Sequence, residues 1–203
     1  MQIDSAALAR HRDALDVASE VVRAVRPDDL RRPTPCAGWD LRALLAHMVG
    51  QNHGFADAVC GPADVSATAF APRPVGEDVA EAWTASAERV AAAFAAAPAE
   101  GEVLLVEISE DRRFPTTTVL GFHLLDTVVH TWDVAVALGR DFHPGAEVAE
   151  IVRRGAAAIP TGPDRERPDS PFAPALDLPV ADPWTAALAL LGRRHDAAPT
   201  RAR

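Results

Sequence analysis

Lysine is missing from this sequence: all 20 basic residues are arginine. Schiff-base catalysis requires a lysine amine, and phosphate-binding loops commonly use one as a point charge, so both of these lysine-dependent chemistries are excluded. Positive charge is also outweighed, because the 203 residues carry a formal net charge of −9. Nucleic-acid binding through counterion release needs a broad basic surface. We therefore expect no nucleic-acid partner.

Cysteines and long apolar runs are also scarce. Two cysteines, Cys36 and Cys60, are too few for a disulfide scaffold, and no apolar export segment follows the first residues. The alanine-rich apolar runs, such as Val90 to Ala97, are much shorter than the roughly 20 residues that cross a membrane. The sequence therefore predicts a cytoplasmic protein with no membrane partner.

Apolar residues at helical spacing dominate the rest of the sequence, and 48% of the chain is hydrophobic. Prolines and glycines separate these stretches. The pattern predicts an all-α fold, a four-helix bundle in residues 1–160, followed in residues 161–203 by a Pro-rich irregular strap and a short helix that packs on the bundle. We treat the β-prone run Val103 to Val106 as an extended connection, because it has no obvious partner strand. The expected long helices run from about Ser5 to Val25, from Trp39 to the glycine at position 61, from Glu77 to Ala97 and from Thr116 to Leu138, and shorter ones from Gly145 to Ala158 and from Trp184 to Leu191.

The fourth long helix contains the run LLDTVVHTWD, with Asp126 and His130 four residues apart. Residues at this spacing share one face of a helix, so the carboxylate and the imidazole can hold one ion. Bundles build metal sites from facing helices, and His47 on the second helix supplies a third donor. Three protein ligands leave a coordination position open, which is typical of catalytic sites. Zinc is the first choice, with nickel, iron and manganese as alternatives.

The residues alone leave several alternatives open. His123 lies three residues before Asp126 and could replace it as a ligand or support the site from outside. Gln51 is one turn after His47 and is a further candidate for such support. Asp133 could orient a ligand imidazole or simply pair with an arginine. A lone histidine on an apolar helix face is more often a core residue, and periodicity alone makes a ligand role for the trio no more favoured than a structural one.

A resemblance to a known family adds to this interpretation. The stretches TPCAGWDLRALLAHMVGQNHGF, GFHLLDTVVHTWDVAVALG and DPWTAALALLGR resemble actinobacterial proteins of the mycothiol-dependent maleylpyruvate isomerase type, within the DinB-like superfamily. The resemblance implies a four-helix bundle and a divalent metal held by His47, Asp126 and His130. Two departures stand out: the isomerase type has Glu where this chain has Asp126, and it carries an additional C-terminal domain.

Two functions are compatible with these features. One is a metal-dependent enzyme that uses a low-molecular-weight thiol, mycothiol by resemblance, as cosubstrate in thiol transfer or isomerisation of a small molecule. The other is a non-catalytic bundle that binds a metal or a small molecule and could form a homodimer. A catalytic site needs an open coordination position with space above it, so the geometry of the site helps to separate them.

Overall fold

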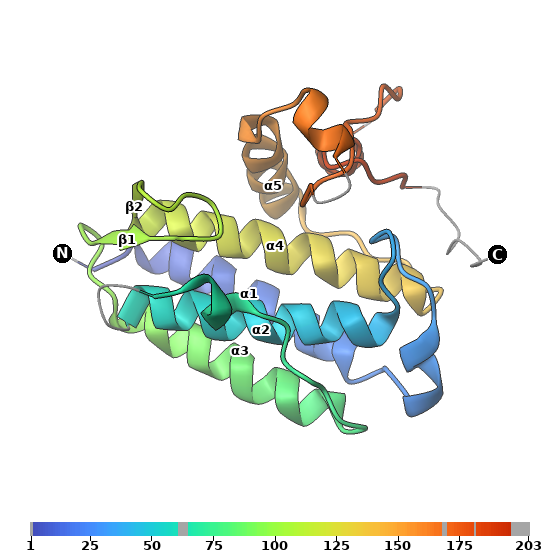
Figure 1. The fold of residues 1–203 in the computed structure, drawn as a ribbon, viewed down its shortest axis with the longest axis horizontal. Coiled ribbons are helices and arrows are strands. Elements are labelled where there is room, and N and C mark those ends of the chain that lie inside the picture. The colour runs from blue at the N-terminus through green and yellow to red at the C-terminus, as the bar shows by residue number, and fades with distance from the viewer. Residues whose placement is uncertain (1, 61–64, 168–169, 181, 196–203) are drawn as a thin grey trace.

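Four long helices form the body of the protein in the computed structural model, which describes residues 2–60, 65–167, 170–180 and 182–195. They are α1 (Ser5–Val22), α2 (Leu41–Cys60), α3 (Val79–Ala96) and α4 (Thr116–Ala137). In Figure 1, α1 and α4 run in one direction and α2 and α3 in the other. Each of α1 and α2 packs against both α3 and α4. The predicted all-α bundle is confirmed.

Aspartates begin several of these helices. The carboxylates of Asp4, Asp40 and Asp78 each accept a hydrogen bond from a backbone N–H three residues later. These bonds satisfy amide groups that have no partner in the first turn of a helix. At the other end of α4, Gly139 has a φ of 69°, the left-handed conformation in which helices commonly stop. Local sequence therefore sets the helix boundaries close to where the apolar periodicity places them.

A short β-hairpin lies in the connection between α3 and α4. Strand β1 (Glu102–Leu104) pairs antiparallel with β2 (Arg113–Pro115), and Val103 faces Phe114. The treatment of Val103 to Val106 as an unpaired connection is wrong. The sequence does not reveal the partner strand, because that strand is only three residues long and has no periodicity of its own. The hairpin contacts α4, beside its first part (Figure 1), and also contacts α2.

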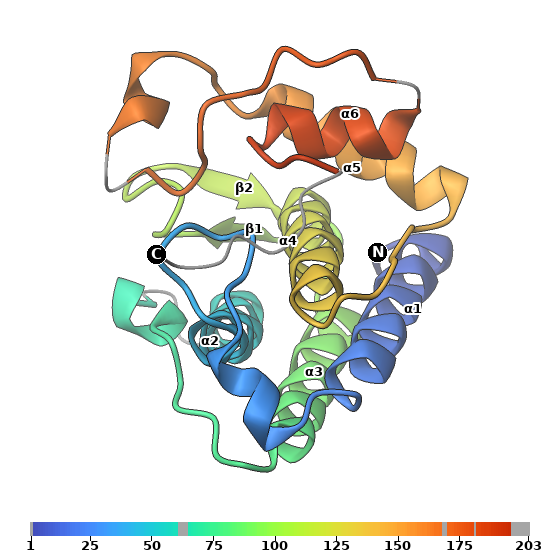
Figure 2. The ribbon, with the colours of Figure 1, turned by 90° about the vertical axis from the view of Figure 1, so that its right-hand side faces the viewer.

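A second layer covers one side of α4. It consists of α5 (Ala146–Ala158), a 3₁₀ turn at Pro163–Glu166 and α6 (Pro183–Leu190). Figure 2 shows α5 and α6 beside each other, above α4. Trp184 and Leu188 of α6 pack with Trp132 of α4 in a core cluster separate from that of the bundle. The division at residue 160 stays a prediction, and the predicted C-terminal unit extends past the last described residue, at position 195.

One buried arginine anchors the irregular segment before α6 through hydrogen bonds. The Arg165 guanidinium donates hydrogen bonds to the carbonyls of Pro160, Ile159 and Leu190. Because these carbonyls belong to the end of α5 and the end of α6, Arg165 joins the two helices. None of the helices in the described ranges is long and apolar enough to cross a lipid bilayer.

Candidate metal centre

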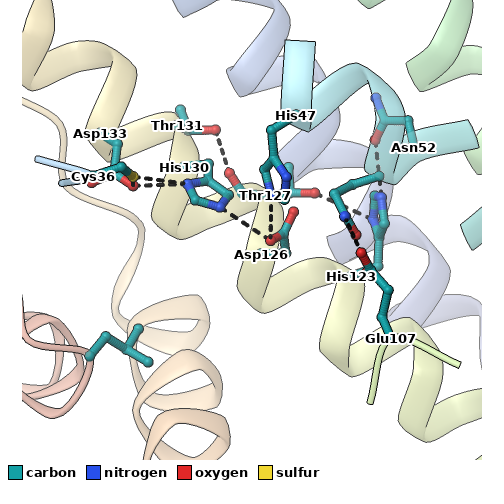
Figure 3. Close-up of polar contacts among 12 residues, drawn as sticks. Cys36, His47, Asn52, Glu107, His123, Asp126, Thr127, His130, Thr131 and Asp133 are labelled. Carbon is teal, nitrogen blue, oxygen red and sulfur yellow. Dashed lines mark hydrogen bonds and ion pairs between the residues drawn. The ribbon is translucent and has the colours of Figure 1, made fainter. Parts of the chain in front are cut away.

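The three predicted ligands meet between α2 and α4. Asp126 Oδ1 lies 3.3 Å from His130 Nε2 and 4.0 Å from His47 Nε2. The two imidazole rings are 5.1 Å apart and nearly perpendicular. Figure 3 shows the three side chains pointing toward one another. Their donor atoms all lie within 4.8 Å of each other, so one ion can reach all three.

This donor set fits a divalent metal of the zinc type. Ligand bonds of about 2.0–2.1 Å in a tetrahedral site put neighbouring donors about 3.3 Å apart. The Asp126–His130 separation already matches that spacing, and His47 needs only a small shift. The side chains of His47 and Asp126 keep 19% and 26% of their surface exposed, so the group is reachable from solvent. Two imidazoles and one carboxylate suit zinc as well as nickel, iron or manganese.

The second nitrogen of His130 has its own partner. Nδ1 lies 2.9 Å from Asp133 Oδ2, one turn further along α4. A hydrogen bond from Nδ1–H to this carboxylate leaves Nε2 as the nitrogen that faces Asp126 and His47. Metal-bound histidines are commonly oriented in this way. Asp133 also binds Arg193, which is the predicted pairing with an arginine, while its role in orienting a ligand imidazole stays a prediction.

Burial and the surrounding charges set the protonation of these groups. Burial would raise the pKa of Asp126, but the neighbouring His130 and His47 lower it to about 2. Burial would lower the pKa of His130, but Asp126 and Asp133 hold it well above its usual value. The pKa of His47 is lowered, chiefly by burial. Without a metal, Asp126 and His130 therefore form an ion pair, and a metal must displace the proton of His130.

Cys36 belongs to a second cluster on the far side of the His130 ring. Its Sγ lies 3.2 Å from Asp133 Oδ2 and 3.9 Å from His130 Nδ1. These three residues are spaced closely enough to hold an ion. However, the Arg193 guanidinium donates to Asp133 and lies 3.5 Å from Cys36 Sγ. A cation already neutralises this cluster, which disfavours a metal there.

Two further groups border the site. The indole of Trp39 lies against the His47 imidazole, with ring centroids 4.8 Å apart. Gln51 Nε2 donates to Glu107 Oε1 at 2.9 Å. Burial raises the pKa of Glu107, and the charge of Asp126 adds to this effect while the Gln51 bond opposes it. Glu107, from the hairpin loop, went unnoticed in the sequence because no helical spacing connects it to the other residues.

His123 lies in a different cluster of the bundle core. Its Nε2 lies 3.0 Å from Asn52 Oδ1, and its Nδ1 lies 3.3 Å from Thr127 Oγ1 (Figure 3). The same Nδ1 lies 2.8 Å from His11 Nε2. Both ring nitrogens are therefore occupied by partners other than the three predicted ligands. His123 is not a member of either group whose donor atoms could hold an ion.

Comparison with known proteins agrees with the helical bundle. A model of the mycothiol maleylpyruvate isomerase N-terminal domain family matches residues 11–135. The chain belongs to this family. An uncharacterised protein of Mycobacterium tuberculosis, found in two strains, is 31% identical over 188 residues, covering 92% of this chain and 97% of the relative. The family match includes all three predicted ligands and Asp133, but it ends before Arg193.

Two solved structures share the fold. A crystal structure of the mycothiol-dependent maleylpyruvate isomerase aligns with a TM-score of 0.65 at 18% identity, covering 94% of this chain and 89% of that chain. A histidine-to-alanine mutant of such an isomerase aligns with a TM-score of 0.58 at 17% identity, over 75% of this chain and 67% of that one. The first alignment leaves 11% of the neighbour uncovered.

Proposed function

We propose that this protein is a divalent-metal-dependent enzyme that uses a low-molecular-weight thiol of the mycothiol type for isomerisation or thiol transfer. The observation that carries the proposal is the convergence of His47 Nε2, Asp126 Oδ1 and His130 Nε2 from two facing helices. Family membership supports the thiol, because the solved neighbours are mycothiol-dependent isomerases.

The residues of the candidate site have separate roles in this proposal. His47, Asp126 and His130 would hold the ion, zinc being our first choice, and three protein donors leave one position for an exogenous group. A divalent ion there would lower the pKa of a bound thiol and polarise a substrate oxygen. Asp133 keeps His130 in the orientation that ligation requires. Trp39 covers one face of the His47 ring and limits the movement of that side chain.

Glu107 is the group that we assign to proton transfer. It is a carboxylate at the border of the site that does not belong to the donor set, and burial raises its pKa. A raised pKa brings a carboxylic acid closer to the range in which it can both accept and return a proton. The hydrogen bond from Gln51 fixes one of its oxygens. The other oxygen is left to exchange a proton with a bound thiol or substrate.

The test uses zinc-loaded protein with mycothiol and maleylpyruvate, the substrate class named for the solved neighbours. We expect thiol-dependent isomerisation by the wild type and none by His47→Ala, which removes one ligand. A panel of other electrophiles, followed by loss of free thiol, extends the test to thiol transfer. If the loaded wild type neither binds the thiol nor consumes any substrate, the enzymatic proposal is wrong and the non-catalytic binding protein remains.

A further inference from the structure

A fully buried carboxylate lies beside the candidate metal centre. The side chain of Asp133 is 0% exposed, and burial alone would raise its pKa. Arg193 opposes this effect most strongly and keeps the pKa of Asp133 far below its usual range. A buried charge is tolerated only when it is paired and hydrogen-bonded. Any role of the Asp133 carboxylate therefore depends on the residues that pair with it.

Arg193 holds both oxygens of this carboxylate. Its Nε lies 3.0 Å from Asp133 Oδ1 and its Nη2 lies 2.8 Å from Oδ2. Two parallel bonds from a planar guanidinium fix the orientation of a carboxylate as well as neutralising it. Asp133 Oδ2 also accepts from His130 Nδ1 at 2.9 Å. The chain of contacts thus runs from Arg193 through Asp133 to the imidazole of His130.

The end of α6 positions Arg193 beside Asp133. Gly192 has a φ of 75°, and the backbone N–H of Arg193 donates to the Leu188 carbonyl at 2.8 Å, which closes the helix. A side chain at Gly192 would meet Ala173 and the carbonyl of Pro174. Arg193 is therefore fixed by a tight helix end and is only 12% exposed at its side chain. The C-terminal layer and the bundle meet at this arginine.

We propose that Arg193 is a positioning residue for metal binding, acting through Asp133 on His130. The inference rests on the proposed metal site. Arg193 fixes the Asp133 carboxylate, and the fixed carboxylate holds His130 Nδ1–H so that Nε2 points at Asp126 and His47. Without Arg193, Asp133 loses its bidentate partner and the imidazole gains freedom to turn. The C-terminal helix α6 then becomes a determinant of metal affinity, although none of its residues is a ligand.

Zinc affinity, measured by competition with a chromophoric chelator, tests this proposal on the full chain. We expect Arg193→Gln to bind zinc about 10- to 100-fold more weakly than the wild type, the range typical for groups that orient metal ligands. Arg193→Lys keeps the charge but not the two parallel bonds, so its affinity should lie between the two. Thermal unfolding of each variant establishes that it is folded at the assay temperature.

Arg165→Gln is the matched control. Arg165 also fastens α6, through the carbonyl of Leu190, but the structure gives it no contact with Asp133 or His130. Zinc affinity should be unchanged in this variant even if its unfolding temperature falls. Equal losses of affinity in Arg165→Gln and Arg193→Gln, or wild-type affinity in Arg193→Gln, would overturn the positioning role.

A second readout needs no metal and separates this proposal from the proposed function. In metal-free protein, the Nδ1 proton of His130 should exchange slowly with solvent by NMR, and Arg193→Gln should accelerate that exchange. If the wild type binds no zinc but this difference is found, the positioning of His130 stands and the metal function falls. Equal exchange rates in the two proteins contradict the positioning role whatever the zinc measurements show.

Discussion

The buried pair His11 and His123 should make the fold sensitive to mild acid. Their side chains are almost fully buried in the bundle core. His123 Nε2–H can donate to Asn52 Oδ1, which makes His123 Nδ1 the acceptor for His11 Nε2–H. A second proton on His123 would place two N–H groups against each other. Burial lowers the pKa of His11 to about 2, with smaller contributions from His123 and Arg12. Burial also lowers the pKa of His123 to about 4, although the charge of Asp126 opposes this effect.

The size of the effect follows from proton linkage. In the unfolded chain both histidines titrate near their usual pKa of about 6.5, so below that pH the unfolded state binds more protons than the native state. Stability is therefore fully present above pH ~6.5 and is lost as the pH falls toward about 4. At pH 5 each histidine accounts for a loss of about 2 kcal/mol, because one pKa unit is worth about 1.36 kcal/mol. The pair then removes about 4 kcal/mol, a large share of the ~5–15 kcal/mol that stabilises a typical domain.

Urea unfolding at several pH values between 7.5 and 5 measures this loss. The comparison is between the wild type and His11→Leu, which replaces the imidazole with an apolar side chain and leaves Thr127 as a partner for His123 Nδ1. Other histidines titrate in both proteins and cancel in the difference. We expect the variant to lose stability less steeply, by about 1.4 kcal/mol per pH unit below pH 6. The same slope in both proteins would refute the assignment of neutral buried histidines.

Three further predictions concern packing and the metal site. Gly50→Ala should destabilise the fold by about 1–3 kcal/mol in urea unfolding, because the new Cβ would meet the Ala71 carbonyl. Gly121→Ala should instead stabilise the fold by about 0.5–1 kcal/mol, because that position on α4 has open space around it. Similar effects of the two substitutions would contradict the packing of α2. Asp126→Asn should weaken zinc binding at least tenfold, while Asp126→Glu should keep most of the zinc affinity. If competition titrations rank the two variants in the reverse order, the Asp126 carboxylate is not a zinc ligand. Zinc affinity should rise with pH, with a proton released on binding, because the pKa of His130 is held above its usual value; pH-independent affinity would count against ligation by His130.

The sequence predicted the helices well because their signals are local. Apolar spacing, the prolines and the glycine at position 139 placed α1 and α4 within a few residues of their observed ends. The pairing of Asp126 with His130 also follows from local geometry, since four residues make about one helical turn. His47 required a second helix to pack in register, which periodicity alone could not establish and the family resemblance suggested.

The missed features depend on contacts between distant residues. Arg193 reaches Asp133 across 60 residues, and nothing in the run of arginines near the C-terminus distinguishes it. Cys36 has no metal-ligand spacing in the sequence, and only the folded chain places its sulfur beside His130. His123 shares a helix with the predicted ligands, yet its ring turns into the core toward His11. Side-chain direction at such positions is decided by the neighbouring helices, which single-sequence patterns do not specify.

The most direct test of the account is the metal content of protein purified without a chelator or a histidine tag. Elemental analysis is made on the wild type and on His130→Ala. We expect a stoichiometric divalent metal in the wild type and its loss in the variant, since in our proposal His130 would bind through Nε2, which faces Asp126, while Asp133 holds Nδ1. A wild-type protein that holds no metal even after reloading with excess zinc would contradict the account, and Asp126 and His130 would then be an ordinary ion pair on α4.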